Sequence, residues 1–302
     1  MPPSSLRSSS KWCRKYVDRL RLPLPDPLLL PWASCGLSRP PATLESTRSR
    51  FSLDHALRQL NGCVRHSKAA HFSYSASPSG TCGYGSMALE FTGGHVAAGS
   101  PAIYRDGLGC GACFQVRCKN TRVCRSAGVK VTLTDLNKGN STGLVLNKGA
   151  FVSMAKNGKA QELMRRGIVD VEYKRIPCEY SRHNLSIRVE ETKKGSNHLA
   201  IKLLYQGGQT DILGVDVAQV DSPIWHAMDR DYGPVWSTIG RVPTRPLYFR
   251  MVITGGYDGK WLWTPKAVLP ADWTIGSVYD MGIQIADTAQ EDCYPCDSGE
   301  WK

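Results

Sequence analysis

The chain has 302 residues, with 41% hydrophobic residues, 29 glycines, 18 prolines and a formal net charge of +12. This length is enough for two domains that each bury a core. So basic a chain would ordinarily suggest a nucleic-acid partner, but ten Lys and Arg against four Asp and Glu lie in residues 1–62, and the remainder mixes both signs. This distribution argues against nucleic acid, and no segment has the ~18 apolar residues that a membrane span needs.

Residues 1–62 are predicted to be a basic extension outside any folded domain. The Leu22–Trp32 stretch has the apolar residues of a signal-peptide core, but four prolines and Asp26 interrupt it. Serines flanked by Arg and Lys indicate disorder or an organelle presequence. The interpretation that we favour is a non-native leader, joined to the chain by a wrong start or exon choice.

Six of the eleven cysteines lie among glycines in one block with few helix signals: Cys82, Cys110, Cys113, Cys118, Cys124 and Cys178. An even set in a strand-forming stretch is typical of disulfides made in an oxidising compartment, so we predict a secreted protein. The alternative is zinc, because Cys-x-x-Cys pairs begin at Cys110 and Cys293. No second close pair completes a tetrahedral set nearby, so we predict no metal site.

Residues 63–178 are predicted to form a first, mainly β domain. Short runs of β-branched and aromatic residues alternate with period two and end at Gly or Asn turns; they cover Phe114–Arg117, Val129–Thr134 and Ile168–Tyr173. One helix is predicted over Lys148–Met164, with Gly167 as its stop. The segment Ile176–Tyr180 is the expected junction, because its proline ends a strand.

Residues 179–288 are predicted to form an antiparallel β-sandwich, since alternating runs recur at short intervals with turn residues between them. A Cys-containing tail, residues 289–302, completes the chain. The predicted strands are Leu185–Val189, Leu199–Tyr205, Ile212–Val217, Leu247–Ile253 and Gly282–Ile285.

Several long, ordered motifs from Cys63 to Trp301 resemble the plant expansin superfamily: Cys82–Gly85, Gly109–Cys113, Thr134–Asn137, Tyr173–Cys178 and Leu269–Trp273. Three others are similar to the expansin-like A branch in particular: Cys63–Ala70, Leu204–Thr210 and Gly256–Trp261. The resemblance implies a mainly β protein, a six-stranded double-psi β-barrel like that of family-45 glycoside hydrolases followed by an immunoglobulin-like, carbohydrate-binding β-sandwich. It also implies the disulfides Cys82–Cys110, Cys113–Cys178 and Cys118–Cys124, and leaves open the pairing of Cys63, Cys293 and Cys296.

The resemblance implies binding without catalysis. Inverting glycosidases need one carboxyl group as acid and another as base, but Val145 occupies the position of the family's groove aspartate. Asp135 matches an acidic position of the family, and a turn residue is the other interpretation of it. We therefore predict a secreted, non-lytic cell-wall protein that loosens wall polysaccharide contacts. The alternatives are a weak endo-β-glucanase that uses Asp135, and a structural or defence-related glycan-binding protein.

The expected ligands are cellulose, xyloglucan and, as a further candidate, pectin, bound by a monomer without a cofactor. Exposed aromatic rings stack on sugar faces, and the polysaccharide-binding residues expected from the resemblance are Asp135, His71, Phe72, His198 and Trp236. Four other tryptophans are expected in the core: Trp225, Trp261, Trp263 and Trp273. Two sequons, at Asn140 and Asn184, are predicted glycosylation sites if the chain is secreted, and a glycan on Asn140 would obstruct the expected barrel groove.

Overall fold

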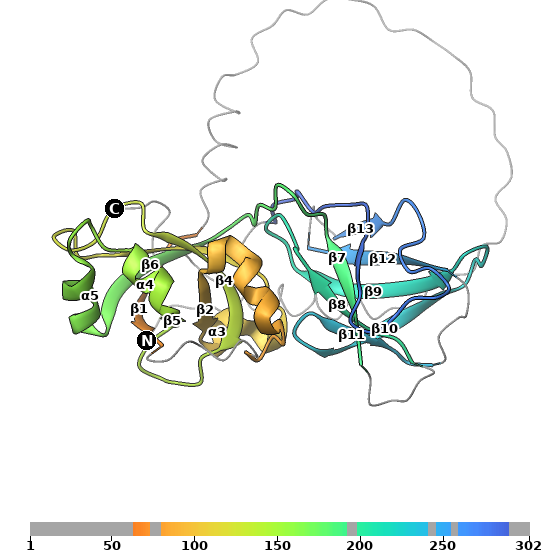
Figure 1. The fold of residues 1–302 in the computed structure, drawn as a ribbon, viewed down its shortest axis with the longest axis horizontal. Coiled ribbons are helices and arrows are strands. Elements are labelled where there is room, and N and C mark those ends of the chain that lie inside the picture. Colours follow the sequence, from red (N-terminus) through yellow and green to blue (C-terminus); the bar gives the residue numbers. More distant parts are fainter. Residues whose placement is uncertain (1–62, 73–79, 192–197, 241–245, 255–258, 290–302) are drawn as a thin grey trace, which may run out of the picture. The chain divides into compact units, whose positions relative to one another are not determined.

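The computed structural model describes residues 63–72, 80–191, 198–240, 246–254 and 259–289. The predicted extension over residues 1–62 and the tail from residue 290 lie outside these ranges, and so do Cys293 and Cys296. The described strands divide into a closed barrel and a separate eight-stranded sheet, both drawn in Figure 1.

The barrel contains six strands in the order β1-β5-β2-β4-β3-β6, and pairing of β1 with β6 closes it. Apolar residues that alternate along the strands, such as Val129, Val131 and Leu133 on β4, point into one core and are buried. The strands are β1 (Arg65–His71), β2 (Val96–Gly99), β3 (Cys113–Cys118), β4 (Val129–Leu136), β5 (Leu144–Leu146) and β6 (Val169–Ile176).

Short helices cover the barrel: η1 (Gly85–Gly94), α3 (Pro101–Tyr104), η2 (Arg105–Gly107), α4 (Lys148–Ser153) and α5 (Ala160–Arg166). The single helix predicted over Lys148–Met164 is wrong, because α4 ends at Ser153 and α5 begins at Ala160. Gly158 adopts a φ of 78° between them, which breaks a helix. Asn147 caps α4 by accepting a hydrogen bond from the backbone N–H of Ala150.

The second body is a sheet of eight antiparallel strands in the order β13-β12-β9-β10-β11-β8-β7-β14. Phe249 and Ile187 lie on strands far apart in this order yet belong to one buried core, so the sheet curls around that core and forms the predicted sandwich. The strands are β7 (Ser186–Glu190), β8 (Ala200–Leu204), β9 (Ile212–Gln219), β10 (Trp225–Tyr232), β11 (Val235–Thr238), β12 (Leu247–Ile253), β13 (Lys260–Trp263) and β14 (Val278–Asp280).

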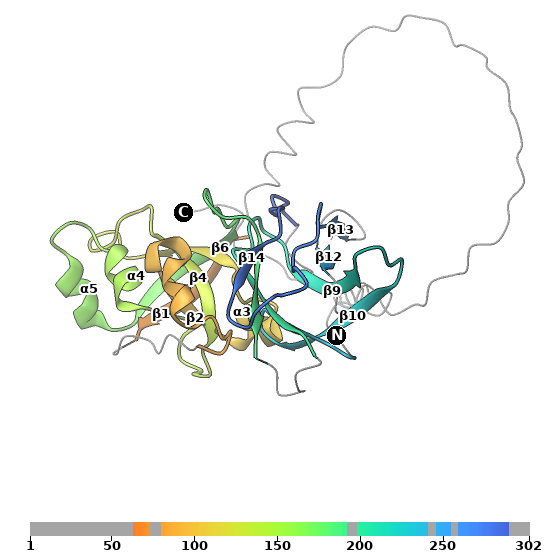
Figure 2. The same ribbon diagram turned by 45° about the vertical axis from the view of Figure 1, so that its right-hand side comes forward.

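Most predicted strands coincide with observed ones, but the run Gly282–Ile285 does not form a strand. The strand near it is β14, which ends at Asp280, pairs with β7 and is labelled in Figure 2. Gly282 adopts a φ of 69°, and this left-handed conformation is incompatible with an extended strand. The apolar residues of this run still have a structural role, because Ile285 is buried in the sandwich core.

Three disulfides join the barrel's cysteines: Cys82–Cys110, Cys113–Cys178 and Cys118–Cys124. They are the three pairs that the resemblance implied, and they leave no thiolate of these six for zinc. Cys63 is also disulfide-bonded. Such cross-links stabilise a fold mainly by restricting the unfolded chain, typically by about 2–4 kcal/mol each.

Charged side chains connect the barrel to the sandwich. Asp211, directly before the sandwich's β9, accepts hydrogen bonds from Arg105 and Arg175 of the barrel, at 2.8 Å in each case. An aromatic cluster lies beside them, in which Tyr84 and Phe91 of the barrel pack with Tyr205 of the sandwich. The two bodies therefore share buried polar and apolar contacts.

Candidate functional site

A row of four residues crosses four neighbouring barrel strands. Register pairs Asp135 on β4 with Ala98 on β2, Ala98 with Val145 on β5, and Val145 with Ala70 on β1. Paired residues share a face of the sheet, and the alternate residues Ala97, Leu144 and Ala69 point into the barrel core. The row therefore lies on the outside of the barrel.

A register shift decides the orientation of Asp135. On β2 and β4, Ala97 pairs with Leu133 and Ala98 with Asp135, so Thr134 is an extra residue. Without this irregularity Asp135 would share the inward face of Leu133, because side chains alternate along a strand. The extra residue thus moves the carboxylate from the core to the outer row.

The Asp135 carboxylate holds a loop against the barrel. Its Oδ1 atom accepts hydrogen bonds from the backbone N–H of Thr81 at 2.6 Å and of Leu136 at 2.8 Å, and it also contacts the Thr81 hydroxyl. Accepting backbone N–H groups is the role that the turn interpretation of this residue predicts. The same bonds place Thr81 beside the outer row.

Tyr104 is a neighbour of Asp135 that the sequence analysis missed, and Asp106 is in turn a neighbour of Tyr104. Burial raises the pKa of the Tyr104 hydroxyl, and the negative charges of Asp135 and Asp106 raise it further. Asp106 is exposed and adopts a left-handed φ of 52°. The signal in the sequence was the run Asp106-Gly107-Leu108-Gly109, since closely spaced glycines often accompany backbone that ordinary side chains disfavour.

Val145 lies two strands from Asp135 in the row. Adjacent strands are about 4.8 Å apart, so the two residues are separated by roughly 10 Å across the sheet. In an inverting glycosidase, the second carboxylate lies about 6.5–9.5 Å from the first. In this row, the side chain at about that distance from Asp135 is the hydrocarbon side chain of Val145. The row itself therefore supplies a single carboxylate.

His71 and Phe72 follow at the end of β1. The His71 ring packs against buried Phe151, with 5.0 Å between ring centroids, and its Nδ1 atom lies 3.2 Å from the carbonyl oxygen of Phe72. Both residues are half-buried. They lie next to Ala70, so the structure brings this pair to the β1 end of the row, with Asp135 at the β4 end.

The expectation that Trp236 offers an exposed ring is wrong. Trp236 is only 3% exposed, packs in the sandwich core and has the Arg230 guanidinium 4.4 Å from its ring centroid. Its register partner on β8 is buried Ile201, so this face of β11 points inward. The exposed ring nearby is Tyr232, which is 48% exposed.

Tyr232 lies directly against the barrel. A Cβ atom on Gly83 would be 2.7 Å from the Tyr232 ring, and the following Gly233 lies close to Cys82 and Cys110. Gly83 is two residues from Thr81, which binds Asp135. Asp135, Thr81, Gly83 and Tyr232 therefore form a continuous series of contacts from the barrel to the sandwich, which we call the bridging surface.

His198 lies two residues before the start of β8. Tyr232 pairs with Val235, Val235 pairs with Lys202, and His198 precedes Lys202 by four residues. The Nδ1 atom of His198 is buried and has no hydrogen-bond partner among the described residues.

The expectation that Trp261 and Trp263 are buried is also wrong. They are 47% and 51% exposed on the edge strand β13. Trp225 is half-buried on β10, and Trp273 packs partly buried against the sandwich core. Two tryptophans of one strand that share a face looked like core residues, but this face of the strand is the outer one.

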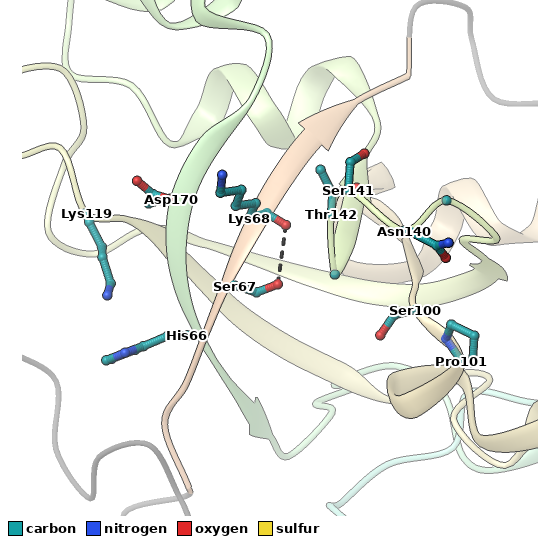
Figure 3. Close-up of a pocket in the computed structure, with 12 residues that line it drawn as sticks. His66, Ser67, Lys68, Ser100, Pro101, Lys119, Asn140, Ser141, Thr142 and Asp170 are labelled. Carbon is teal, nitrogen blue, oxygen red and sulfur yellow. Dashed lines mark hydrogen bonds between the residues drawn. The ribbon is translucent and has the colours of Figure 1, made fainter.

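The sequon residues Asn140 and Asn184 are both exposed. Asn140 lines an open depression of about 670 Å³, together with His66, Ser67 and Lys68 of β1, as Figure 3 shows. The Asn184 amide donates a hydrogen bond to Asp280 at 3.1 Å.

Comparison with known proteins agrees with this architecture. Residues 185–270 match the expansin C-terminal domain, and residues 96–173 match a double-psi β-barrel family described as lytic transglycolase. Expansin-like A1 of Arabidopsis thaliana is 52% identical over 83% of this chain and 96% of its own length, and expansin-like A3 of Oryza sativa subsp. japonica is 56% identical over 80% and 89%. The chain belongs to the expansin-like A branch of the expansin superfamily.

Solved structures show the same fold at low sequence identity. The apo expansin of Clavibacter michiganensis has a TM-score of 0.54 and 19% identity to this expansin-like A chain, and covers 77% of it and 98% of its own length. A variant of that bacterial protein, in complex with cellohexaose, matches to the same extent.

The described part of this expansin-like A chain contains no group of three or more His, Cys, Asp or Glu residues arranged to hold a metal ion. In the same part, no helix is long and apolar enough to cross a membrane. What the bridging surface offers is an exposed ring, a carboxylate and backbone polar groups. This chemistry suits the binding of a neutral sugar chain.

Proposed function

We propose that this protein is a secreted, non-lytic cell-wall protein that binds cellulose and hemicellulose along the bridging surface and loosens their noncovalent contacts. The observation that carries the proposal is the position of Tyr232. Tyr232 is 48% exposed and its ring lies on Gly83, so it continues the barrel surface that contains Thr81 and Asp135. A polymer that contacts both bodies can follow this path.

The stacking of a sugar on Tyr232 is the proposed source of affinity. The face of a β-linked glucose unit presents C–H groups, and an exposed aromatic ring hides this apolar area from water. The Asp135 carboxylate and the Thr81 backbone are proposed to orient hydroxyl groups of sugars further along the chain, with His71, Phe72 and His198 as additional contacts. Binding at both ends of the surface would compete with contacts between wall polymers.

The absence of hydrolysis follows from the residues of the outer row. General acid–base cleavage needs two groups that exchange protons with the glycosidic oxygen and with water. Val145 has no proton to exchange, and Asp135 is already an acceptor for two backbone N–H groups. One oxygen of the Asp135 carboxylate is thus committed to holding the Thr81 segment against the barrel.

The second candidate is a weak endo-β-glucanase, and one observation favours it. Asp106 and Asp135 both act on the pKa of Tyr104, so a second carboxylate, outside the row, lies near the same tyrosine. If Asp106 were the missing acid, hydrolysis would require both carboxylates. The third candidate, a purely structural or defence-related glycan binder, would bind without loosening.

The partners and location complete the proposal. We propose cellulose and xyloglucan as ligands, with pectin as a salt-sensitive further ligand because the chain is basic, and no nucleic acid. The protein would act as a monomer in the extracellular wall. The three disulfides support an oxidising compartment, where exposed Asn140 and Asn184 would be available for glycosylation.

The test is a pull-down of the full chain with crystalline cellulose, with release of new reducing ends measured in the same tubes. We expect retention without sugar release. Replacing Tyr232→Ala should lower retention about tenfold, a loss equivalent to about 1.4 kcal/mol. Tyr232→Phe, which keeps the ring, should retain most of the binding, and Ile275→Ala, which removes another exposed apolar side chain, should leave retention unchanged.

Two outcomes would contradict the proposal. The wild type could release reducing ends, and Asp106→Asn or Asp135→Asn could abolish that release. This result would establish the glucanase. If cellulose retained Tyr232→Ala and the wild type equally, the bridging surface would not be the binding site. Extension of heat-inactivated wall strips separates loosening from binding alone, since a structural binder would be retained and produce no extension.

A further inference from the structure

Three tryptophans and an arginine form an exposed cluster that the bridging surface does not include. Trp225, Trp261 and Trp263 surround the Arg250 guanidinium, whose central carbon lies 4.6, 4.6 and 5.0 Å from their ring centroids. We call these four residues the tryptophan patch. Trp261 and Trp263 are about half exposed, which is unusual for so large an apolar side chain unless it contacts a partner.

The tryptophan patch lies on a different part of the sheet from Tyr232. Its residues come from β13, β12 and the first residue of β10, whereas Tyr232 is the last residue of β10. The first half of β10 pairs with β9 and the second half with β11. Seven residues along a strand span about 23 Å, so one ring of sugar cannot contact both places.

The rings of the patch are held in place before any ligand arrives. Arg250 donates a hydrogen bond from Nε to Asp216 Oδ2 at 2.7 Å, which fixes the guanidinium that the three rings surround. Trp225 stands perpendicular to Trp263, with 5.2 Å between centroids. Because cation–π and edge-to-face contacts already order these side chains, little rotamer entropy would be lost on binding.

The charges near the patch are paired, which favours a neutral ligand. Arg250 is bound to Asp216, and their side chains are only 22% and 16% exposed. Lys260, which precedes Trp261, pairs with Asp287 at 2.9 Å. An acidic polysaccharide would need an unpaired cation at the surface, and these two cations are both occupied.

The orientation of the two exposed rings favours a single twisted chain over a crystal surface. The centroids of Trp261 and Trp263 are 6.2 Å apart, a separation comparable to the advance of one sugar, but their planes are inclined by 41°. Flat cellulose presents coplanar sugar faces and would contact only one of two inclined rings. An isolated β-linked chain can rotate about its glycosidic bonds, so that successive sugars face successive rings.

We propose that the tryptophan patch is a second polysaccharide site, which binds a single neutral hemicellulose chain through stacking on Trp261 and Trp263. This inference rests on the proposed function only in the class of ligand, since its residues are separate from the bridging surface. The two sites would allow one molecule to hold a cellulose surface and a soluble glycan chain at the same time.

The experiment measures soluble and crystalline glycans in parallel, using the full chain with its disulfides formed. Affinity electrophoresis with xyloglucan, arabinoxylan and mixed-linkage β-glucan reports single chains, and depletion on crystalline cellulose reports the flat surface. We expect the double variant Trp261→Ala/Trp263→Ala to lose at least tenfold in affinity for one of the soluble glycans while keeping its retention on cellulose. Tyr232→Ala should show the opposite pattern.

The conservative variant Trp261→Phe/Trp263→Phe keeps two rings and should keep most of the soluble-glycan affinity. Urea unfolding of each variant verifies that the fold is intact. The proposal is overturned if the alanine double variant, still folded, migrates like the wild type in every soluble glycan. It is also overturned if none of the three glycans retards the wild type and the double variant instead loses self-association, which would make the patch a protein contact.

Discussion

At the residue scale, burial separates two aromatic side chains that lie four positions apart. Trp236 belongs to the sandwich core and Tyr232 to the surface. We expect Trp236→Ala to lower the free energy of unfolding by about 3–5 kcal/mol, as truncation of a buried aromatic residue does. Among the molecules that remain folded, cellulose retention should be unchanged.

Urea denaturation and retention of the folded fraction measure the two effects separately. Trp263→Ala is the matched control, because it removes an equal ring from an exposed position and should shift the urea midpoint far less. A Trp236→Ala protein of normal stability that no longer binds cellulose would show that this ring contacts sugar after all.

The tryptophans also show where prediction from sequence stops at this scale. Period-two alternation identifies which residues share a face, and Trp261 and Trp263 do share one. It does not say whether that face points inward, because this depends on the strands that pair with it. Trp236 was misplaced for the same reason, since its burial follows from pairing with Ile201 on a strand far away in sequence.

At the scale of elements, the site depends on the fit between the 80–83 segment and β4. A Cβ atom on Gly80 would lie 2.5 Å from the backbone oxygen of Thr134, a contact that only movement of one segment can relieve. We expect Gly80→Ala to destabilise the protein by about 1–3 kcal/mol and to lower cellulose retention, because Thr81 would be displaced from Asp135. Gly240→Ala is the control, since no atom of the described residues lies within 4 Å of its added Cβ.

Thermal unfolding and the cellulose pull-down of these two glycine variants provide the measurements. Equal behaviour of both would mean that the 80–83 segment does not need its close approach to β4. The sequence predicted the strands β3, β4, β6, β7, β8, β9 and β12 well, because each contains a run of apolar residues that ends near turn residues. It did not predict the extra residue at Thr134 that directs Asp135 outward, since a register shift is a property of two strands together.

At the scale of the whole molecule, Asp211 connects the two bodies through a buried charge. Burial alone would raise the pKa of its carboxyl group, but the charges of Arg175 and Arg105 and their hydrogen bonds lower it to about 2. A lowered pKa stabilises the fold above the ordinary value near 4, and this contribution is lost as the pH falls towards 2. At neutral pH it amounts to about 2 kcal/mol.

We therefore expect the wild type to lose stability between about pH 4 and pH 2, and Asp211→Asn to be less stable at neutral pH with a flatter decline over that interval. Unfolding by urea at a series of pH values measures both. Glu179→Gln, which removes an exposed partner of Lys130, should follow the wild-type curve. If the acid decline of Asp211→Asn is as steep as that of the wild type, other carboxyl groups control it.

The contact between Gly83 and Tyr232 also has an evolutionary meaning. A side chain at position 83 would collide with the ring at position 232, and the φ of 69° at Gly83 adds a second reason for glycine. The two positions thus share one steric constraint, although they belong to different bodies of the protein. Among related sequences, position 83 should carry a side chain only where the residue at position 232 is smaller than tyrosine. The barrel and the sandwich are therefore expected to have changed together at these two positions.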